Sequence, residues 1–107
     1  MTAARILFIA ANPSIDRLYE LDRLTVGAIH RPELVASVPG GKGLNAARAA
    51  ALLGGRVTAV GIVGGRSGEW IREGLAARGI DARWIASGGE TRTCVSILDR
   101  ATGSPRS

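Results

Sequence analysis

The chain has 107 residues, a net charge of +5 and 46% hydrophobic residues, so it is expected to form one small globular domain with a modest core. The charge comes from arginines spread along the sequence, and aromatic residues make up only 4%, which argues against a nucleic-acid partner. A single cysteine excludes an internal disulfide and fits a reducing cytoplasm. No apolar run is long enough to span a membrane, and one histidine and one cysteine cannot build a protein metal site.

The first part of the chain predicts strands. A continuous apolar run over residues 5–11 predicts a buried parallel strand, which ends in a polar turn that carries Asp16. The mixed segments 19–26 and 29–38 suit short strands beside a sheet.

Two helices are predicted further along. Residues 43–53 have strong helix propensity, and Gly54 and Gly55 follow them as a stop. Ser67 is expected to cap the N-terminus of a second helix that runs to Arg78.

Strands are predicted between and after these helices, over 56–63, 82–86 and 91–98. An alternation of strand, helix, strand, helix and strand is typical of an α/β fold. We therefore predict a parallel sheet with helical crossovers.

The last predicted strand has one polar face, because side chains alternate across a strand and place Arg92, Cys94 and Ser96 together. Residues 99–103 then predict a hairpin loop with a glycine where positive φ is needed. Only residues 104–107 remain for the returning strand. We expect either an edge that is left unpaired or an incomplete sequence.

A glycine cluster opens the helix predicted over 43–53. Gly40, Gly41 and Gly43 surround Lys42, the only lysine of the chain. Such a loop brings backbone N–H groups and the positive end of a helix dipole towards anions or hydroxylated ligands. The pattern is not a Walker A loop, because Gly43 stands where that motif needs a hydroxyl. Nor is it a dinucleotide fingerprint, which would follow the first strand directly. By itself the cluster is better explained as a helix entry without a ligand.

Three motifs in a fixed order favour a ligand. They are N-P-x-I-D at 12–16, G-G-K-G-x-N-x-A-R at 40–48 and E-T-R-T at 90–93. In this order and spacing they resemble the N-terminal part of the ribokinase-like carbohydrate kinases. Within these they resemble the phosphofructokinase B branch, and most of all its 1-phosphofructokinases. The resemblance implies the N-terminal portion of a ribokinase-like fold, with small lid strands at about 19–38 and 91–98.

The resemblance implies substrate-binding roles for polar residues in all three motifs. Asp16 would accept hydrogen bonds from sugar hydroxyls, and Asn45 could donate and accept at once. Arg92 would pair with the substrate phosphate. Without the resemblance, Asp16 would be interpreted equally well as a turn residue or a helix cap. For Arg92, an exposed strand residue would be the favoured interpretation.

The glycine cluster has implied roles as well. Gly40 and Gly41 would pass close to the sugar, where a side chain would collide. Lys42 could neutralise phosphate charge or only pair with an acidic neighbour. Cys94 departs from the pattern, since this branch often has asparagine there, and this departure could shift substrate preference.

The resemblance also implies what the chain would lack. Kinases of this branch carry D-T-x-G-A-G-D, with the catalytic base and the nucleotide site, in a C-terminal part that would follow Ser107. Residues 1–107 would be a partial, sugar-binding domain, inactive alone, with no catalytic residue of its own. The implied ligands are a sugar phosphate and ATP with Mg²⁺, held largely by phosphates and water.

Several alternatives stay open at this point. Fructose 1-phosphate, tagatose 6-phosphate and fructose 6-phosphate are hard to separate as substrates. The chain could also be a stand-alone sugar-phosphate-binding module, or a remnant without function. The resemblance further suggests that a full-length protein could form a homodimer through the lid strands.

Overall fold

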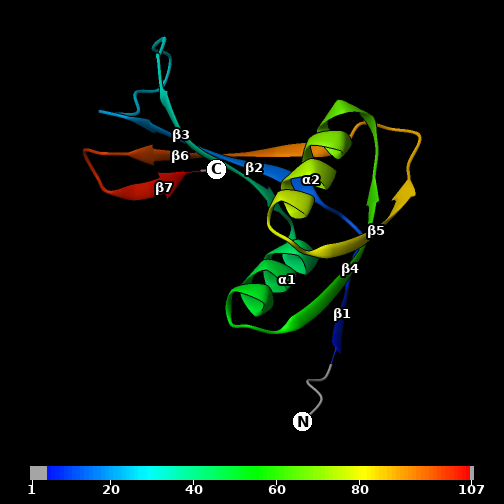
Figure 1. Cartoon of the computed structure of the whole chain (residues 1–107). Coiled ribbons are helices and arrows are strands. Elements are labelled where there is room, and N and C mark those ends of the chain that lie inside the picture. The colour runs from blue at the N-terminus through cyan, green and yellow to red at the C-terminus, as the bar shows by residue number, and fades with distance from the viewer. Residues whose placement is uncertain (1–4, 107) are drawn as a thin grey trace.

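The computed structural model describes residues 5–106, with side chains for residues 5–103. It contains two sheets and two helices (Figure 1). Strands β1 (Arg5–Ala10), β4 (Arg56–Val63) and β5 (Asp81–Ala86) form a three-stranded sheet in the order β1-β4-β5, with both pairs parallel. Helix α1 (Lys42–Leu52) precedes β4, and α2 (Gly65–Ala77) connects β4 to β5. The predicted α/β fold, with a parallel sheet and helical crossovers, is confirmed.

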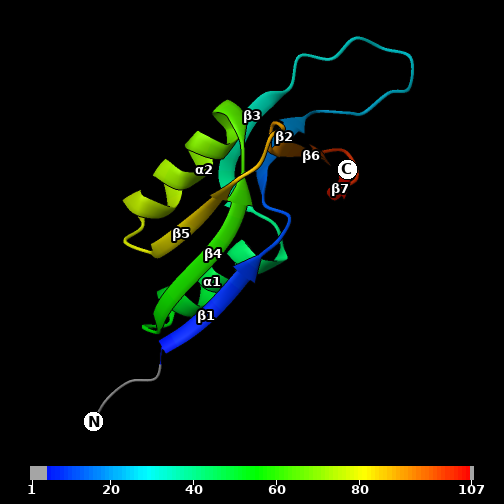
Figure 2. The same ribbon diagram turned by 90° about the vertical axis from the view of Figure 1, so that its right-hand side faces the viewer.

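The core lies between the helices and one face of this sheet (Figure 2). Leu44 and Ala47 of α1 and Ile71 and Leu75 of α2 have exposed fractions of 0%. They pack with the inward residues of β4, such as Ala59, which is also fully buried. Full burial of Leu44, Ile71 and Leu75 contributes about 1.5–3 kcal/mol for each side chain, so this contact is a main source of stability.

The opposite face of the same sheet has no helix on it within residues 5–106. Leu7 and Ile9 of β1 are 58% and 72% exposed, and Ile85 of β5 is 56% exposed. The prediction that the strand over 5–11 is buried is therefore wrong for its outward side chains. The strand is parallel as predicted, but only one of its faces is covered.

The second sheet contains four strands in the order β3-β2-β6-β7. Strand β2 (Ser14–Leu21) lies in the centre, antiparallel to β3 (Glu33–Gly40) and parallel to β6 (Arg92–Asp99). The short β7 (Ser104–Arg106) pairs antiparallel with β6, so the predicted hairpin is present. The end of β6 is paired by these three residues, although the sequence predicted an edge left unpaired or an incomplete sequence. Gly103 has φ 68°, as the hairpin loop requires.

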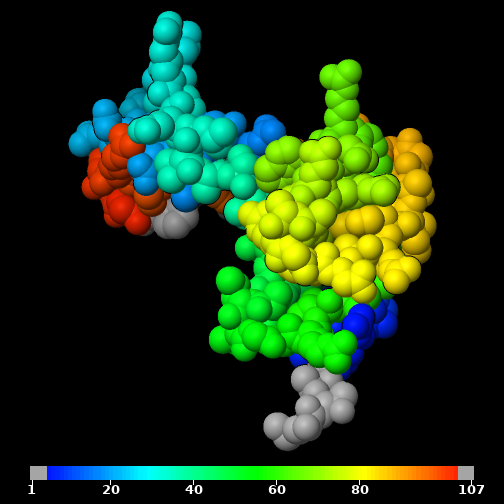
Figure 3. Space-filling model, in the orientation of Figure 1, coloured from blue at the N-terminus to red at the C-terminus, as the bar shows by residue number. Residues whose placement is uncertain are grey.

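The second sheet projects to one side of the body formed by the first sheet and the helices (Figure 3). Its strands β2 and β3 contact the helices, and Ile15 of β2 belongs to the hydrophobic core. A connection over residues 22–32 extends from its far end (Figure 2). At the tip of this connection, Val26 and Ile29 are 99% and 95% exposed. No helix of the described residues is long and apolar enough to cross a membrane.

Two predicted strands lie at other positions than expected. The strand predicted over 19–26 begins at Ser14, so Asp16 belongs to the middle of a strand and not to a turn. The strand predicted over 29–38 runs from Glu33 to Gly40. The reason is that β2 follows Pro13 directly and has partners on both sides, which keep the polar residues Ser14 and Asp16 in the ladder.

The start of helix α2 also differs from the prediction. The helix begins at Gly65, not after Ser67, and its N-cap residue Gly64 makes no side-chain hydrogen bond. The cap comes from far along the chain, because the Glu90 carboxylate accepts a hydrogen bond from the Ser67 backbone N–H at 2.7 Å. Thr91 Oγ1 accepts a second one from the Gly64 N–H at 2.9 Å. The first two residues of E-T-R-T thus hold the beginning of α2.

Candidate functional site

The polar residues of the three sequence motifs meet around a hollow of about 400 Å³. Strand β2, strand β6 and the first turns of α1 form its walls. The residues that line it are Ser14, Asp16, Gly41, Lys42, Asn45, Arg92, Cys94, Val95 and Ser96.

A second hollow of about 330 Å³ continues from the first, since Gly41, Lys42 and Arg92 line both. It reaches the end of β1 and the connection through Asn12 and Pro13. The two hollows therefore lie beside the carboxyl end of a parallel strand, where open α/β sheets bind their ligands.

Asp16 provides the only carboxylate of the first hollow. It lies on β2, opposite Val38 of β3 and Cys94 of β6. Its Oδ1 accepts a hydrogen bond from Ser14 Oγ at 2.6 Å, and Ser14 is itself 1% exposed. This bond holds one carboxylate oxygen, and the other remains available to accept a hydrogen bond from a ligand hydroxyl.

At the two glycines that precede α1, other atoms of the protein occupy the space that a side chain would need. Gly40 pairs with Ser14 across the β2–β3 ladder, and a Cβ atom at Gly40 would overlap the Asp16 carboxylate. Gly41 has φ 94°, and a Cβ there would lie 2.8 Å from the Asn12 carbonyl oxygen. The sequence argument gave a different reason, a collision with the sugar. In the structure the carboxylate and the β1–β2 connection already require glycine at both positions.

The N-terminus of α1 opens towards the hollow through Gly41, Lys42 and Asn45. No side chain caps this helix end, and its first turn contains no acidic residue. Lys42 is exposed and forms no ion pair within residues 5–106, so the alternative of pairing with an acidic neighbour is not realised. The Asn45 Oδ1 accepts a hydrogen bond from Arg48 at 2.8 Å, which leaves the amide N–H groups for a ligand.

Arg92 is the first residue of β6 and lines both hollows. Its Nη1 donates a hydrogen bond to Cys94 Sγ at 3.0 Å, and its Nη2 donates one to the Asn12 carbonyl oxygen at 3.2 Å. The guanidinium is paired with no carboxylate among the described residues. Its charge is therefore free to attract an anion.

Together these groups can bind a ligand that has hydroxyls at one end and a negative charge at the other. Asp16 accepts from hydroxyls, while Arg92, Lys42 and the open end of α1 attract an anion. The donor set does not suit a metal ion, since residues 5–106 contain no cluster of three or more histidine, cysteine or acidic side chains.

The structure brings together five of the six residues predicted from the sequence, Asp16, Gly41, Lys42, Asn45 and Arg92, around one hollow. The sixth, Gly40, lies behind the Asp16 carboxylate.

Sequence reasoning missed Ser14 and Asn12 as members of the site. The signal for Ser14 was its position two residues before Asp16, on the same face of a strand. Asn12 belongs to N-P-x-I-D, but the motif does not indicate its role, because its contribution is a backbone carbonyl oxygen that accepts from Arg92.

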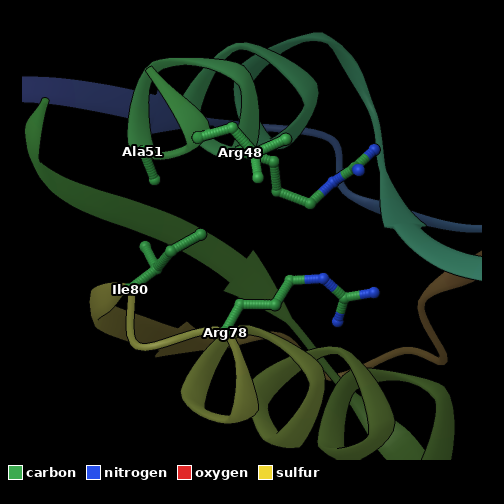
Figure 4. Close-up of a pocket in the computed structure, with 5 residues that line it drawn as sticks. Arg48, Ala51, Arg78 and Ile80 are labelled. Carbon is green, nitrogen blue, oxygen red and sulfur yellow. The ribbon is translucent and has the colours of Figure 1, made fainter. Parts of the chain in front are cut away.

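A separate cavity of about 160 Å³ lies between the two helices and contains none of the predicted residues (Figure 4). Ala51 and Ile80 are among its apolar lining residues, and Arg48 and Arg78 extend along it from opposite sides. Both arginines have partners: Arg48 bonds to Asn45, and Arg78 Nη1 donates to the Gly74 carbonyl oxygen at 2.8 Å.

Comparison with solved structures places the fold among phosphofructokinases. The tetrameric inhibited form of phosphofructokinase-2 from Escherichia coli matches with a TM-score of 0.89 and 29% identity, over 95% of this chain and 34% of that one. A possible 1-phosphofructokinase from Thermotoga maritima matches with a TM-score of 0.86 and 29% identity, over 96% and 34%. A putative phosphofructokinase from Staphylococcus aureus matches with a TM-score of 0.80 and 27% identity, over 94% and 32%.

The chain thus spans about a third of the length of the solved structures that it matches. The fold is that of the N-terminal part of these ribokinase-like kinases. A family model of the pfkB family carbohydrate kinases matches residues 10–106. The match covers the three sequence motifs and the site that they build, and the chain belongs to the pfkB family of carbohydrate kinases.

Proposed function

We propose that this chain is the sugar-binding part of an ATP-dependent hexose-phosphate kinase of the cytoplasm. The proposed reaction converts fructose 1-phosphate into fructose 1,6-bisphosphate. The observation that carries the proposal is the placement of Asp16 and Arg92 on two paired strands, lining one hollow with the N-terminus of α1.

The roles follow from the chemistry of the groups. Asp16, oriented by Ser14, accepts hydrogen bonds from sugar hydroxyls and sets the direction in which the sugar lies. Arg92 and Lys42 neutralise the charge of the substrate phosphate, and Asn45 donates to a hydroxyl. These groups bind and orient the sugar phosphate, and we assign none of them as a catalytic base.

ATP supplies the phosphoryl group, and Mg²⁺ neutralises its charge in this class of reaction. Asp16 is the one carboxylate of the hollow and is already bonded to Ser14. The described residues fit a sugar phosphate and do not fit a nucleotide with its metal. We therefore place that site, with the catalytic base, in residues outside this chain, and we read residues 1–107 as a partial kinase domain. The second sheet, including segments 19–38 and 91–98, would be the lid over the sugar.

The proposal is tested with the gene product at its natural length. ATP-dependent formation of the corresponding hexose 1,6-bisphosphate is measured with fructose 1-phosphate, fructose 6-phosphate and tagatose 6-phosphate. We expect fructose 1-phosphate to have the highest kcat/KM. Asp16→Asn and Arg92→Ala each remove a charged hydrogen-bonding group, so each should raise the Kd for the sugar phosphate by about 10- to 100-fold.

Arg56→Ala is the matched control, because Arg56 is exposed at the amino end of β4, away from the hollow. It removes the same positive charge and should leave the Kd unchanged. An equal loss of affinity in Arg92→Ala and Arg56→Ala would contradict a specific phosphate site and indicate general charge attraction.

Two other results point to other functions. Preference for fructose 6-phosphate or tagatose 6-phosphate would make the protein another kinase of the same branch. Tight binding of a sugar phosphate without ATP consumption would indicate a stand-alone binding module, the second candidate, whose ligand would be held by residues such as Asp16, Asn45 and Arg92 around the hollow. No binding of any of the three would contradict both.

A further inference from the structure

The guanidinium of Arg92 is held at two points, although its side chain is exposed. Nη1 donates to Cys94 Sγ on the same strand, and Nη2 donates to the Asn12 carbonyl oxygen in the β1–β2 connection. An arginine side chain has many rotamers, and two bonds of 3.0 Å and 3.2 Å restrict them. A guanidinium has more N–H donors than these bonds use, so others remain for a phosphate oxygen.

We propose that Cys94 is a positioning residue, whose sulfur orients the Arg92 guanidinium for the phosphate of the substrate. This inference rests on the proposed function, because it assigns Cys94 a role through Arg92 in that same site. Cys94 is half-buried, lines the hollow and lies two residues from Arg92 on the same face of β6. It is the only cysteine of the chain and forms no disulfide.

The benefit of this contact is preorganisation. Ordering an exposed arginine on binding costs conformational entropy, and a side chain that is already held in place loses less of it. A neutral thiol is a weak acceptor, so the bond can orient the guanidinium without competing with a phosphate for its charge. The Asn12 carbonyl oxygen alone would hold only one edge of the guanidinium.

The test is a double-mutant cycle in the gene product at its natural length. The Kd for fructose 1-phosphate is measured by calorimetry for the unaltered protein, Cys94→Ala, Arg92→Lys and the double variant. We expect Cys94→Ala to raise the Kd by about 2- to 10-fold, the range for loss of one hydrogen bond, and to raise KM with kcat unchanged. Lysine lacks the planar fork that Cys94 holds. Cys94→Ala should therefore have no further effect in the Arg92→Lys background.

Two more variants separate orientation from packing. Cys94→Val keeps a side chain that suits a strand but offers no acceptor, so it should raise the Kd as Cys94→Ala does. Thr93→Val changes the neighbouring residue on the other face of β6 and should leave the Kd unchanged. An effect of alanine that valine restores would come from a packing defect and would overturn the inference.

The remaining outcomes distinguish this inference from the proposed function. If Arg92→Lys raises the Kd and Cys94→Ala does not, the positioning role is wrong and the sugar-phosphate site stands. If Cys94→Ala weakens binding equally in both backgrounds, Cys94 contacts the ligand itself and the inference is overturned. If no variant changes the Kd for fructose 1-phosphate, Arg92 does not bind the phosphate and the proposed function itself fails.

Discussion

The lack of a side chain at Gly40 determines the shape of the hollow. It is the last residue of β3 and pairs with Ser14, so its Cα lies beside the side chain that bonds to Asp16. Any Cβ at this position would occupy the space of the Asp16 carboxylate. The glycine therefore determines where the acceptor of the site lies, although it does not line the hollow.

A Gly40→Ala substitution tests this relation. The new methyl group must displace the Asp16 carboxylate, so we expect the Kd for the sugar phosphate to rise about tenfold, as when a hydrogen bond to a charged group is weakened. The thermal midpoint should fall, because Gly40 is buried. The measurement is calorimetric titration beside a thermal scan.

Gly88→Ala is the matched control, since a Cβ at Gly88 meets no atom within 4 Å. It should change neither quantity. Normal affinity in Gly40→Ala would show that Asp16 does not need its present position.

The sequence motifs predict which residues form the site, but not the structural reasons why some of them are required there. Asp16 and Arg92 are expected from the motifs alone, yet the need for glycine at 40 depends on the pairing of β2 with β3. That pairing brings Gly40 to Ser14, which lies more than twenty residues earlier in the chain, and it has no local signature. The same holds for the contact between Arg92 and Asn12, which are 80 residues apart.

Helix α2 depends for its beginning on a residue of a distant segment. Glu90 accepts the Ser67 N–H at 2.7 Å, where the helix dipole also favours a negative charge. The hydrogen bond from the Ser67 backbone N–H, followed by that from the Ser67 side chain, lowers the pKa of Glu90 below its ordinary value. The folded state therefore holds this proton less tightly than the unfolded state, and the carboxylate stabilises the fold at neutral pH.

This linkage predicts how stability changes with pH. A group with a lowered folded-state pKa contributes its stability above the unfolded pKa and loses it as pH falls through the folded pKa. Glu90→Gln should lower the thermal midpoint at pH 7. The difference from the unaltered protein should shrink as the pH falls below the ordinary glutamate pKa, about 4.3, and vanish below the lowered folded-state pKa. The measurement is a series of thermal scans from pH 7 down through this acid range.

Glu73→Gln, also exposed and on α2, should show no such difference. A difference for Glu90→Gln that persists at acid pH would mean that the carboxylate charge is not the cause.

At the level of elements, the sequence predicts best where glycines and apolar periodicity agree. Strand β4 matches its predicted bounds, and α1 begins and ends one residue earlier than predicted. The first residues of β2 were not predicted as strand, because a polar stretch after Pro13 is typical of a turn. The residue type of Ser67 suits a helix cap, but Ser67 does not cap α2. The Glu90 carboxylate, from outside the helix, accepts the hydrogen bond of the Ser67 backbone N–H instead.

The whole molecule has two lobes, each built on one sheet, and the two sheets differ in how much of their apolar surface is buried. The helices cover one face of the first sheet, whereas the second sheet carries exposed apolar residues at its far end, including Leu34 and Val35 at 51% and 49%. The tip of the connection over 22–32 adds Val26 and Ile29. Exposed apolar residues gathered at one end are typical of an interaction surface.

We propose that the gene product at its natural length forms a homodimer through this second sheet. Sedimentation should then show a dimer, and Val26→Asp together with Ile29→Asp should convert it to a monomer by placing charges in the interface. The exposed Leu52→Asp, at the end of α1, is the control and should leave the dimer intact. A monomer in the unaltered protein, with the strands of the second sheet ordered, would exclude the proposal.

The hollow lies at the junction of the two lobes, and this position has a thermodynamic consequence. Asp16 and Arg92 belong to the second sheet, whereas Asn45 belongs to a helix packed on the first. A bound sugar phosphate would therefore act as a non-covalent cross-link between two bodies that short connections at 11–13, 41 and 87–91 join. Its binding would raise the free energy of unfolding by about 2.7 kcal/mol at a ligand concentration of one hundred times Kd. The supply of substrate would then contribute to the stability of the folded chain.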